Sequence, residues 1–353
     1  MKKFILLFYF IITSFLSSAQ IYPANSGNVY ELSGPGLAAQ FLLLSADARA
    51  SGLGNTGCSS STDANSIFWN SAKYSLSDKK FGFSVSGLSA DTSGNFSNAN
   101  LVSFSIFKKI KKSAIGLGFR NFATGMVQFV DAAGNNTNSF KPIEYCANIS
   151  YSQGLGEKFS CGMAFGYMYS NLTNSIPLPN GSSTHPAVAL TGGLSLFYQN
   201  KELHTGTKPS ELRFGLSVAD FANKASYTDS PIYKQKNLPT SMRAGTNYNI
   251  HLSELHAIGI IAELSGLLVP ESALAATYKN HTSLFPSAGF QYTLKNWLNI
   301  RVGYYKSPLF HSDYFTSGVG VKLKWFALDV AYQKGISTRS TPDLMQLSTG
   351  ITF

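Results

Sequence analysis

The sequence is built from segments in which apolar and polar residues alternate. The last seven residues, 347–353, alternate in this way and end on Phe353, and similar segments recur back to Phe81 between turn-like stretches. Alternation places the apolar side chains on one face of a strand and the polar ones on the other. Segments of about ten residues, joined by alternately short and long connections, are typical of outer-membrane barrels. We therefore predict an all-β fold, a transmembrane antiparallel β-barrel.

The N-terminus has the features of a secretory signal. Two lysines precede an apolar run over residues 4–15, and a short stretch of small residues ends at Ala19. The run is shorter than the ~20 residues that span a bilayer as a helix, and its length suits the apolar region of a signal peptide. We expect cleavage after Ala19, so that residues 1–19 are the signal peptide and the mature chain is exported to the outer membrane.

Charge is scarce in this chain. Asp, Glu, Lys and Arg make up 13% of the residues, against about 25% in a typical soluble domain, and the mean hydropathy is zero. The outward apolar and inward polar residues of a barrel cancel in such a mean. We assign the formal net charge of +10 to lumen and loop residues, and expect contact with outer-membrane lipid and not with nucleic acid.

Fourteen strands are predicted, and an even number is the rule for such barrels. Their connections are alternately tight and long, apart from one turn of medium length at 200–209, which places both ends of the mature chain in the periplasm. The apolar stretch from Met126 to Asp131 is assigned to a hairpin extension, because a fifteenth strand would break the alternation. The expected strands are 79–89, 99–108, 112–122, 143–153, 158–170, 187–199, 210–219, 239–249, 254–264, 284–294, 297–306, 314–324, 325–335 and 344–353.

The side chains of these strands divide into an outward apolar set and an inward polar set. Ile115, Leu117 and Phe119 form one of the clean outward stripes. Inward charges need partners when they are buried. Two interpretations remain: a self-compensating ladder that holds a plug, which we favour, or a substrate path. The predicted lumen ladder consists of Arg120, Glu144, Arg213, Arg243, Glu263, Arg301, Lys322 and Asp329.

No catalytic, cofactor or metal site is expected. The histidines fall in predicted loops, turns or strand ends, and none lies beside a serine in a G-x-S-x-G motif. His251 and His256 lack the spacing of the H-E-x-x-H motif. Cys146 lies on a polar face and Cys161 on an apolar face of consecutive strands, so we predict that the two do not form a disulfide.

Residues 20–78 lack the pattern of strands. Gly52, Gly54 and Gly57 allow close-packed backbone, but the parallel strand and βαβ unit that a dinucleotide-binding fingerprint needs are missing. Because a barrel much wider than eight strands conducts unless it is filled, we expect an N-terminal arm and a hatch in the lumen, followed by the barrel at 79–353. The position-critical residues of the hatch are predicted to be Asp47, Arg49, Asp63, Trp69 and Asn70.

The hatch segment carries a family resemblance. Residues 41–74, FLLLSADARASGLGNTGCSSSTDANSIFWNSAKY, resemble the N-terminal signature of the PorV family, outer-membrane proteins of the type IX secretion system of Bacteroidota. The most specific parts are the run 47–50 followed by glycines, and the Trp-Asn pair at 69–70; the family usually has Asn-Pro-Ala where this chain has Asn-Ser-Ala at 70–72. The resemblance implies a FadL-like barrel of fourteen strands with an N-terminal hatch. Similar stretches follow in order: SVADFANKASYTD (217–229), LPTSMRAGTNY (238–248), IAELSGLLVP (261–270) and FALDVAY (326–332).

By this resemblance the protein is a non-enzymatic shuttle. PorV-family members take folded cargo from the translocon, a Sov-like or SprA-like protein, by binding the cargo's C-terminal signal domain. They pass it to an attachment complex that contains a PorU-like sortase. The long loops at 171–186, 220–238 and 265–283 offer a contact area for such a domain. The alternative is a FadL-like channel for a hydrophobic small molecule, which a bulge in the wall would favour and a lumen packed with arginine–carboxylate pairs would disfavour.

Overall fold

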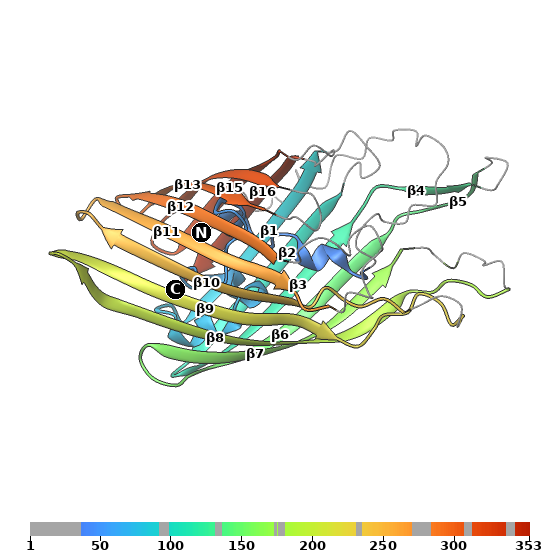
Figure 1. Cartoon of the computed structure of the whole chain (residues 1–353), viewed down its shortest axis with the longest axis horizontal. Coiled ribbons are helices and arrows are strands. Elements are labelled where there is room, and N and C mark those ends of the chain that lie inside the picture. Colours follow the sequence, from blue (N-terminus) through green and yellow to red (C-terminus); the bar gives the residue numbers. More distant parts are fainter. Residues whose placement is uncertain are drawn as a thin grey trace, which may run out of the picture. The chain divides into compact units, whose positions relative to one another are not determined.

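The computed structural model describes residues 37–91, 99–130, 136–172, 175, 181–230, 235–269, 284–306, 313–336 and 343–353. Within these ranges fourteen strands form a closed antiparallel barrel, and β1 pairs with β16 to complete the ring (Figure 1). Closure leaves no strand edge with unpaired backbone groups, which is the condition for a β-sheet in lipid. The predicted barrel and its strand number are confirmed.

The strands lie close to their predicted positions, since the alternation in the sequence marks both the strands and the turns between them. The barrel strands are β1 (Phe81–Asp91), β2 (Asn100–Ile110), β3 (Ser113–Ala123), β6 (Ile143–Gly154), β7 (Phe159–Asn171), β8 (Ala187–Thr205), β9 (Lys208–Ala222), β10 (Ser241–His251), β11 (His256–Leu267), β12 (Leu284–Leu294), β13 (Leu298–Tyr305), β14 (Tyr314–Lys322), β15 (Phe326–Gly335) and β16 (Asp343–Thr352).

One connection differs from the prediction. β8 runs to Thr205 and β9 starts at Lys208, so a turn of two residues replaces the expected medium-length turn at 200–209. Gly206 has φ 62°, a left-handed conformation that glycine adopts without steric cost and that a two-residue hairpin requires. The turns on this side of the barrel are therefore short. We call it the short-turn end, and the opposite side the long-loop end.

A second sheet lies outside the barrel ladder. β4 (Val127–Val130) and β5 (Asn136–Phe140) form a separate two-stranded sheet, whereas β3 pairs directly with β6 in the barrel. The apolar stretch that starts at Met126 therefore adds no strand to the barrel, as predicted. Its last residue, Asp131, lies outside the described residues.

Burial alternates along the barrel strands. In β3, Ile115 and Leu117 are 44% and 50% exposed, whereas Ala114 and Arg120 are almost fully buried. Aromatic rings add to the outer surface, and Tyr145 and Tyr169 of neighbouring strands stack with ring centroids 4.9 Å apart. A continuous apolar exterior of this kind suits contact with lipid.

The cysteines are free thiols. Cys146 of β6 is buried and Cys161 of β7 is half-buried. The register of the two strands pairs Cys146 with Met168, and Cys161 with Gln153. The two thiols therefore lie apart along the strands as well as on different faces.

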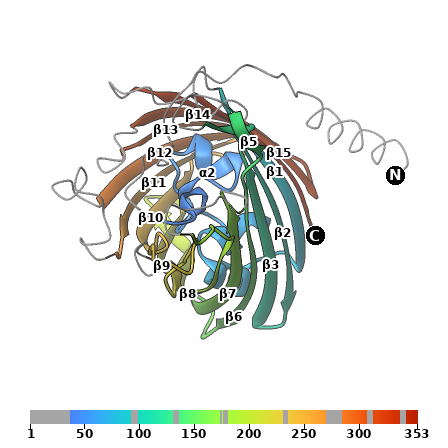
Figure 2. The same cartoon turned by 90° about the vertical axis from the view of Figure 1, so that its right-hand side faces the viewer.

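Residues 37–78, which we call the hatch, form short helical turns inside the ring of strands, and Figure 2 shows α2 there. None of the helices in the described residues is long and apolar enough to cross a membrane. The predicted signal peptide (residues 1–19) and the rest of the predicted arm (residues 20–36) lie outside the described residues. The turns of the hatch are η1 (Gln40–Leu43), α2 (Ala48–Gly52), η2 (Ala64–Phe68) and η3 (Ser71–Leu76).

Side chains of the hatch itself fix where these turns begin. Asp47, Asp63 and Asn70 are the N-caps of α2, η2 and η3, and each accepts a backbone N–H hydrogen bond from the turn that follows. Such caps satisfy donors that a helix leaves unpaired at its start. Three of the predicted hatch residues thus have a local structural role.

Candidate functional site

The hatch is hydrogen-bonded to strands on several sides of the barrel. The Ala48 amide donates to Ser348 Oγ of β16 at 2.7 Å, and the Gly54 amide donates to Thr316 Oγ1 of β14 at 3.0 Å. On the opposite part of the ring, Asn70 Nδ2 donates to the carbonyl oxygen of Leu196 in β8 at 2.9 Å. The hatch is therefore held across the lumen and not against one wall alone.

Glycines bring the hatch backbone into direct contact with the wall. Gly54 has φ 74°, and a Cβ atom there would lie 2.6 Å from the carbonyl oxygens of Ala288 and Tyr304. Gly289 and Gly303 of the wall face the same turn, and a Cβ on either would meet Leu53 or Gly54 at 2.5 Å or less. The glycine spacing that formally matches a nucleotide fingerprint serves close packing here.

One carboxylate of the predicted ladder joins hatch and wall. Glu263 Oε2 accepts hydrogen bonds from the amides of Gly57 and Cys58, both at 2.9 Å. Its Oε1 pairs with Arg243 Nη1 at 3.0 Å, and the Arg243 guanidinium lies over the Trp69 ring, 4.9 Å from its centroid. The structure thus brings two predicted ladder residues and one predicted hatch residue into one cluster.

The remaining hatch residues continue this network. Trp69 Nε1 donates to Asp47 Oδ2 at 2.6 Å, and Arg49 pairs with Asp63 at 3.1 Å. Burial, and then the negative charge of Asp63, raise the pKa of Asp47 to about 6. Asn70, besides its bond to the wall, donates to the Cys58 carbonyl oxygen at 3.2 Å. All five predicted hatch residues are therefore interconnected or bonded to the wall.

Arg120 of β3 links the start of the hatch to a residue of β9, four strands away in the ring. Its Nη1 donates to the carbonyl oxygen of Leu42 at 2.9 Å, and its Nη2 lies 3.7 Å from Asp220 of β9. Asp220 was not predicted as a lumen residue, because the expected strand ended at 219. The register of β8 and β9 shifts between Gly192 and Leu194, and Asp220 has φ 57°. This bulge reverses the alternation and turns Asp220 inward.

The other ladder residues divide into paired and unpaired groups. Arg301 pairs with Asp329 at 2.6 Å. Arg213 pairs with Glu211, a partner that the prediction missed although it lies two residues away on the same face of β9. Glu144 accepts a hydrogen bond from Ser170 at 2.6 Å and has no cationic partner within the described chain. Lys322 is exposed at the end of β14, apart from these pairs.

Lys73 is a buried cation that sequence reasoning did not select. Its Nζ donates to the carbonyl oxygen of Gly57 at 2.8 Å and to Ser60 Oγ at 3.1 Å, and burial lowers the pKa of its ammonium group. These bonds fasten η3 to the glycine-rich turn. Its position three residues after Asn70, a predicted hatch residue, was the available signal.

At the long-loop end the lumen is apolar. Phe41 and Leu42 of the hatch pack in a buried cluster with Leu101 and Met168 of the wall, and Leu238 of the 220–238 loop joins the same cluster. The amide of Ala38 donates to the Asn237 carbonyl oxygen at 2.9 Å. The described part of this loop therefore lies directly on the hatch.

Polar space remains between hatch and wall on the side of β9 to β12. A cavity there has a volume of ≈ 180 Å³, and Arg49, Arg213 and Asn247 line it together with His251. Within the described ranges no group of three or more His, Cys, Asp or Glu residues could hold a metal ion. His185 lies beside Asp229 and His256 beside Tyr292; His281 and His311 are outside those ranges.

The comparisons with known proteins agree with this architecture. Solved structures with this fold include the toluene transporter TbuX of Ralstonia pickettii (TM-score 0.54, 11% identity, 88% of this chain and 98% of that chain covered). Also similar is the toluene transporter TodX of P. putida, with a TM-score of 0.53, 13% identity, and 88% of this chain and 96% of that chain covered. The monoaromatic hydrocarbon channel CymD has a TM-score of 0.53 and 14% identity, with 88% of this chain and 97% of that chain covered. At these identities the likeness shows the fold alone. No curated protein matches the sequence.

The sequence itself matches a family model. The model describes the type IX secretion system protein PorV, and it matches residues 35–273. This range holds the hatch and the wall from β1 to β11, including the cluster around Glu263. Because the match covers more than half of the chain, the protein belongs to the PorV family of the type IX secretion system.

Proposed function

We propose that this protein is the cargo shuttle of a type IX secretion system. It binds the C-terminal signal domain of a secreted protein, takes that protein from a Sov-like or SprA-like translocon, and delivers it to a PorU-like sortase complex. The match to the PorV family over residues 35–273 is the observation that carries this proposal. Binding and transfer need no catalytic group, so we assign no chemistry to the protein itself.

The way the hatch fills the lumen supports a role at the surface. Ion pairs such as Arg243–Glu263 and Arg301–Asp329 occupy the lumen beside the hatch. A folded protein domain cannot pass such a barrel, so it has to dock outside it. We place the mature chain ends in the periplasm, since short turns face the periplasm in this class of barrel, and the long loops then face outward.

The 220–238 loop is the best-defined docking surface among the long loops. Its residues bridge to the 171–186 loop through Thr184 and Thr228, and within the loop Ala225 bridges to Lys236. This hydrogen-bonded layer over an apolar cluster gives a firm platform for a β-sandwich domain. In the third loop, 265–283, residues 270–283 lie outside the described part of the chain.

Deletion and complementation test the proposal. In a strain that lacks the gene, proteins with a common C-terminal signal domain should remain inside the cell. The intact gene should restore their export. A variant shortened within 223–230 should insert as a folded barrel but fail to restore export. Normal export in the deletion strain, with no related gene expressed, would contradict the shuttle function.

A channel for a hydrophobic small molecule is the second candidate, because the wall has a feature that would favour it. Between the pairs Gly192–Phe221 and Leu194–Val218, β9 has one residue more than β8, which is a bulge in β9, and bulges re-aim or interrupt strand pairing. The ladder between β7 and β8 is unbroken and ion pairs fill the lumen, and both features argue against a passage for a small molecule through the wall. Purified barrel in liposomes should therefore not speed the entry of a hydrophobic dye; faster entry would favour the channel.

A further inference from the structure

Lysines gather at the short-turn end of the barrel. The chain at 108–112, where β2 turns into β3, reads Lys-Lys-Ile-Lys-Lys, and two more lysines at 79–80 lead into the adjacent strand β1. Like charges at such short spacing repel one another. The docking of cargo at the long-loop end does not use these residues. Their concentration therefore indicates a separate role for this end of the barrel.

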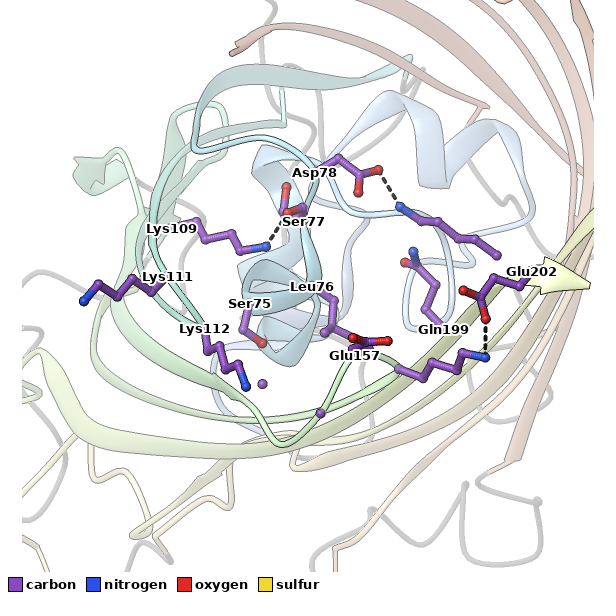
Figure 3. A pocket seen from close by; sticks show the side chains of 14 residues that line it. Ser75, Leu76, Ser77, Asp78, Lys109, Lys111, Lys112, Glu157, Gln199 and Glu202 are labelled. Carbon is purple, nitrogen blue, oxygen red and sulfur yellow. Dashed lines mark hydrogen bonds and ion pairs between the residues drawn. The ribbon is translucent and has the colours of Figure 1, made fainter.

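Three of these lysines, Lys109, Lys111 and Lys112, border a pocket with a volume of ≈ 390 Å³. Its walls are the end of the hatch at 75–78, the β2–β3 and β6–β7 turns and the last part of β8 (Figure 3). Leu76 contributes an apolar surface. Five lysines face three carboxylates, so the lining has an excess of positive charge; they are Lys109, Lys111, Lys112, Lys158 and Lys201 against Asp78, Glu157 and Glu202.

Two of the lysines are available to a ligand. Lys111 and Lys112 are exposed, and the described residues supply neither with a side-chain hydrogen bond or an ion pair. Both belong to a two-residue turn, in which Lys111 has φ 56° where asparagine or glycine is usual. The other three are engaged: Lys109 donates to the Ser77 carbonyl oxygen at 2.6 Å, Lys158 pairs with Glu202 at 2.6 Å and Lys201 with Asp78 at 2.5 Å.

We propose that this pocket docks an acidic peptide segment of a partner protein on the periplasmic side of the membrane. Carboxylates of the segment pair with Lys111 and Lys112, and an apolar side chain packs on Leu76. Lipid headgroups also carry negative charge, but the hatch residues 75–78 form one wall of the pocket. The pocket thus belongs to the aqueous mouth of the lumen and not to the lipid-facing exterior, which favours a peptide. The orientation rests on the proposed function.

Binding of a defined acidic peptide tests this inference. The full-length protein in nonionic detergent is titrated into a fluorescein-labelled peptide of alternating glutamate and leucine, and anisotropy is followed at 50 and 150 mM salt. The double variant Lys111→Gln/Lys112→Gln should weaken binding at least tenfold, and Lys111→Arg/Lys112→Arg should retain it. The matched control is Lys295→Gln/Lys324→Gln, which removes the same charge from exposed residues of two other turns at the short-turn end, outside the pocket, and should leave binding unchanged.

Three results would overturn the proposal. Equal weakening by the control pair would mean a general attraction between opposite charges, and no binding at either salt concentration would mean no site. Dihexanoyl phosphatidylglycerol is added as a competitor in a parallel titration. Displacement of the peptide by this lipid, with the same dependence on the two lysines, would assign the pocket to lipid headgroups. Failure of the cargo assay with intact peptide binding would affect the shuttle function alone.

Discussion

Glu263 accepts two hydrogen bonds from hatch amides and pairs with Arg243, all in a buried setting. Replacing it by alanine leaves a buried guanidinium without its partner, which typically costs about 3–5 kcal/mol. We expect Glu263→Ala to loosen the turn that contains Cys58, a fully buried thiol. With Cys146 and Cys161 changed to serine, maleimide labelling of Cys58 at pH 7 should be at least tenfold faster.

The matched control is Glu254→Ala, which removes an exposed carboxylate from the β10–β11 turn. In this control variant, maleimide should label Cys58 at the same rate as in the parent protein. Equal labelling rates in Glu263→Ala and the parent would show that the carboxylate does not hold the hatch.

Asp47 gives the hatch a pH dependence. Its pKa is raised to about 6 by burial and by Asp63, against 3.8 for an unperturbed aspartate. The folded state therefore holds the proton more tightly, and this contribution to stability grows as the pH falls from about 7 to about 4 and is lost above about pH 6. In a variant that keeps Trp69 as the only tryptophan, the thermal midpoint of its fluorescence should be higher at pH 5 than at pH 8.

The Asp47→Asn variant provides the comparison, because asparagine still caps α2 but does not titrate. In this variant the thermal midpoint of the Trp69 fluorescence should differ much less between pH 5 and pH 8. An unchanged difference in thermal midpoint would assign the pH dependence to a group other than Asp47.

At the scale of single residues, alternation predicts which face a side chain occupies but not which partner it meets. It placed Arg243, Glu263 and Arg301 in the lumen, where the structure has them. It missed Asp220, because the expected strand ended at 219 and a bulge in β9 reverses the alternation just before that residue. The contacts of the hatch with strands hundreds of residues away depend on closure of the barrel, which no local pattern encodes.

Among the elements, the glycine-rich turn of the hatch is the one most sensitive to added volume. A Cβ atom at Gly54 would clash with two wall carbonyl oxygens and would be strained at φ 74°. We expect Gly54→Ala to displace the hatch while the barrel still inserts. Vancomycin sensitivity of the cells should rise, with the heat-dependent gel migration of the folded barrel retained.

Gly156→Ala is the control for this change, since a Cβ there meets nothing within 4 Å. It should leave vancomycin sensitivity at the parental level. If Gly54→Ala behaved in the same way, the close contact between hatch and wall would not be what seals the lumen.

The strands themselves were predictable to within a few residues, and the reason for the one exception is physical. The sequence at 200–209 has few apolar residues, so its alternation is weak, and Gly206 allowed either a loop or a tight hairpin. In the structure β8 and β9 continue through it. The extension forms part of the wall of the basic pocket, which therefore could not be foreseen from the sequence pattern.

For the whole molecule, the closed barrel, the filled lumen and the family match lead to one account. The wall contacts lipid, the hatch is bonded across the lumen, and the loops over the apolar cluster offer a surface for a partner. In this account the protein moves other proteins along the outer membrane and does not conduct small molecules. The sequence predicted the architecture because lipid imposes a strict alternation, whereas the partners leave no comparable pattern.

The most direct test is to purify the tagged protein from native outer membranes under mild detergent and identify what accompanies it by mass spectrometry. The account predicts proteins that share a type IX C-terminal signal domain, together with the translocon or the sortase. Another outer-membrane barrel carrying the same tag is the control for chance recovery. A barrel that is recovered alone, with only lipid or a small hydrophobic ligand, would contradict the account.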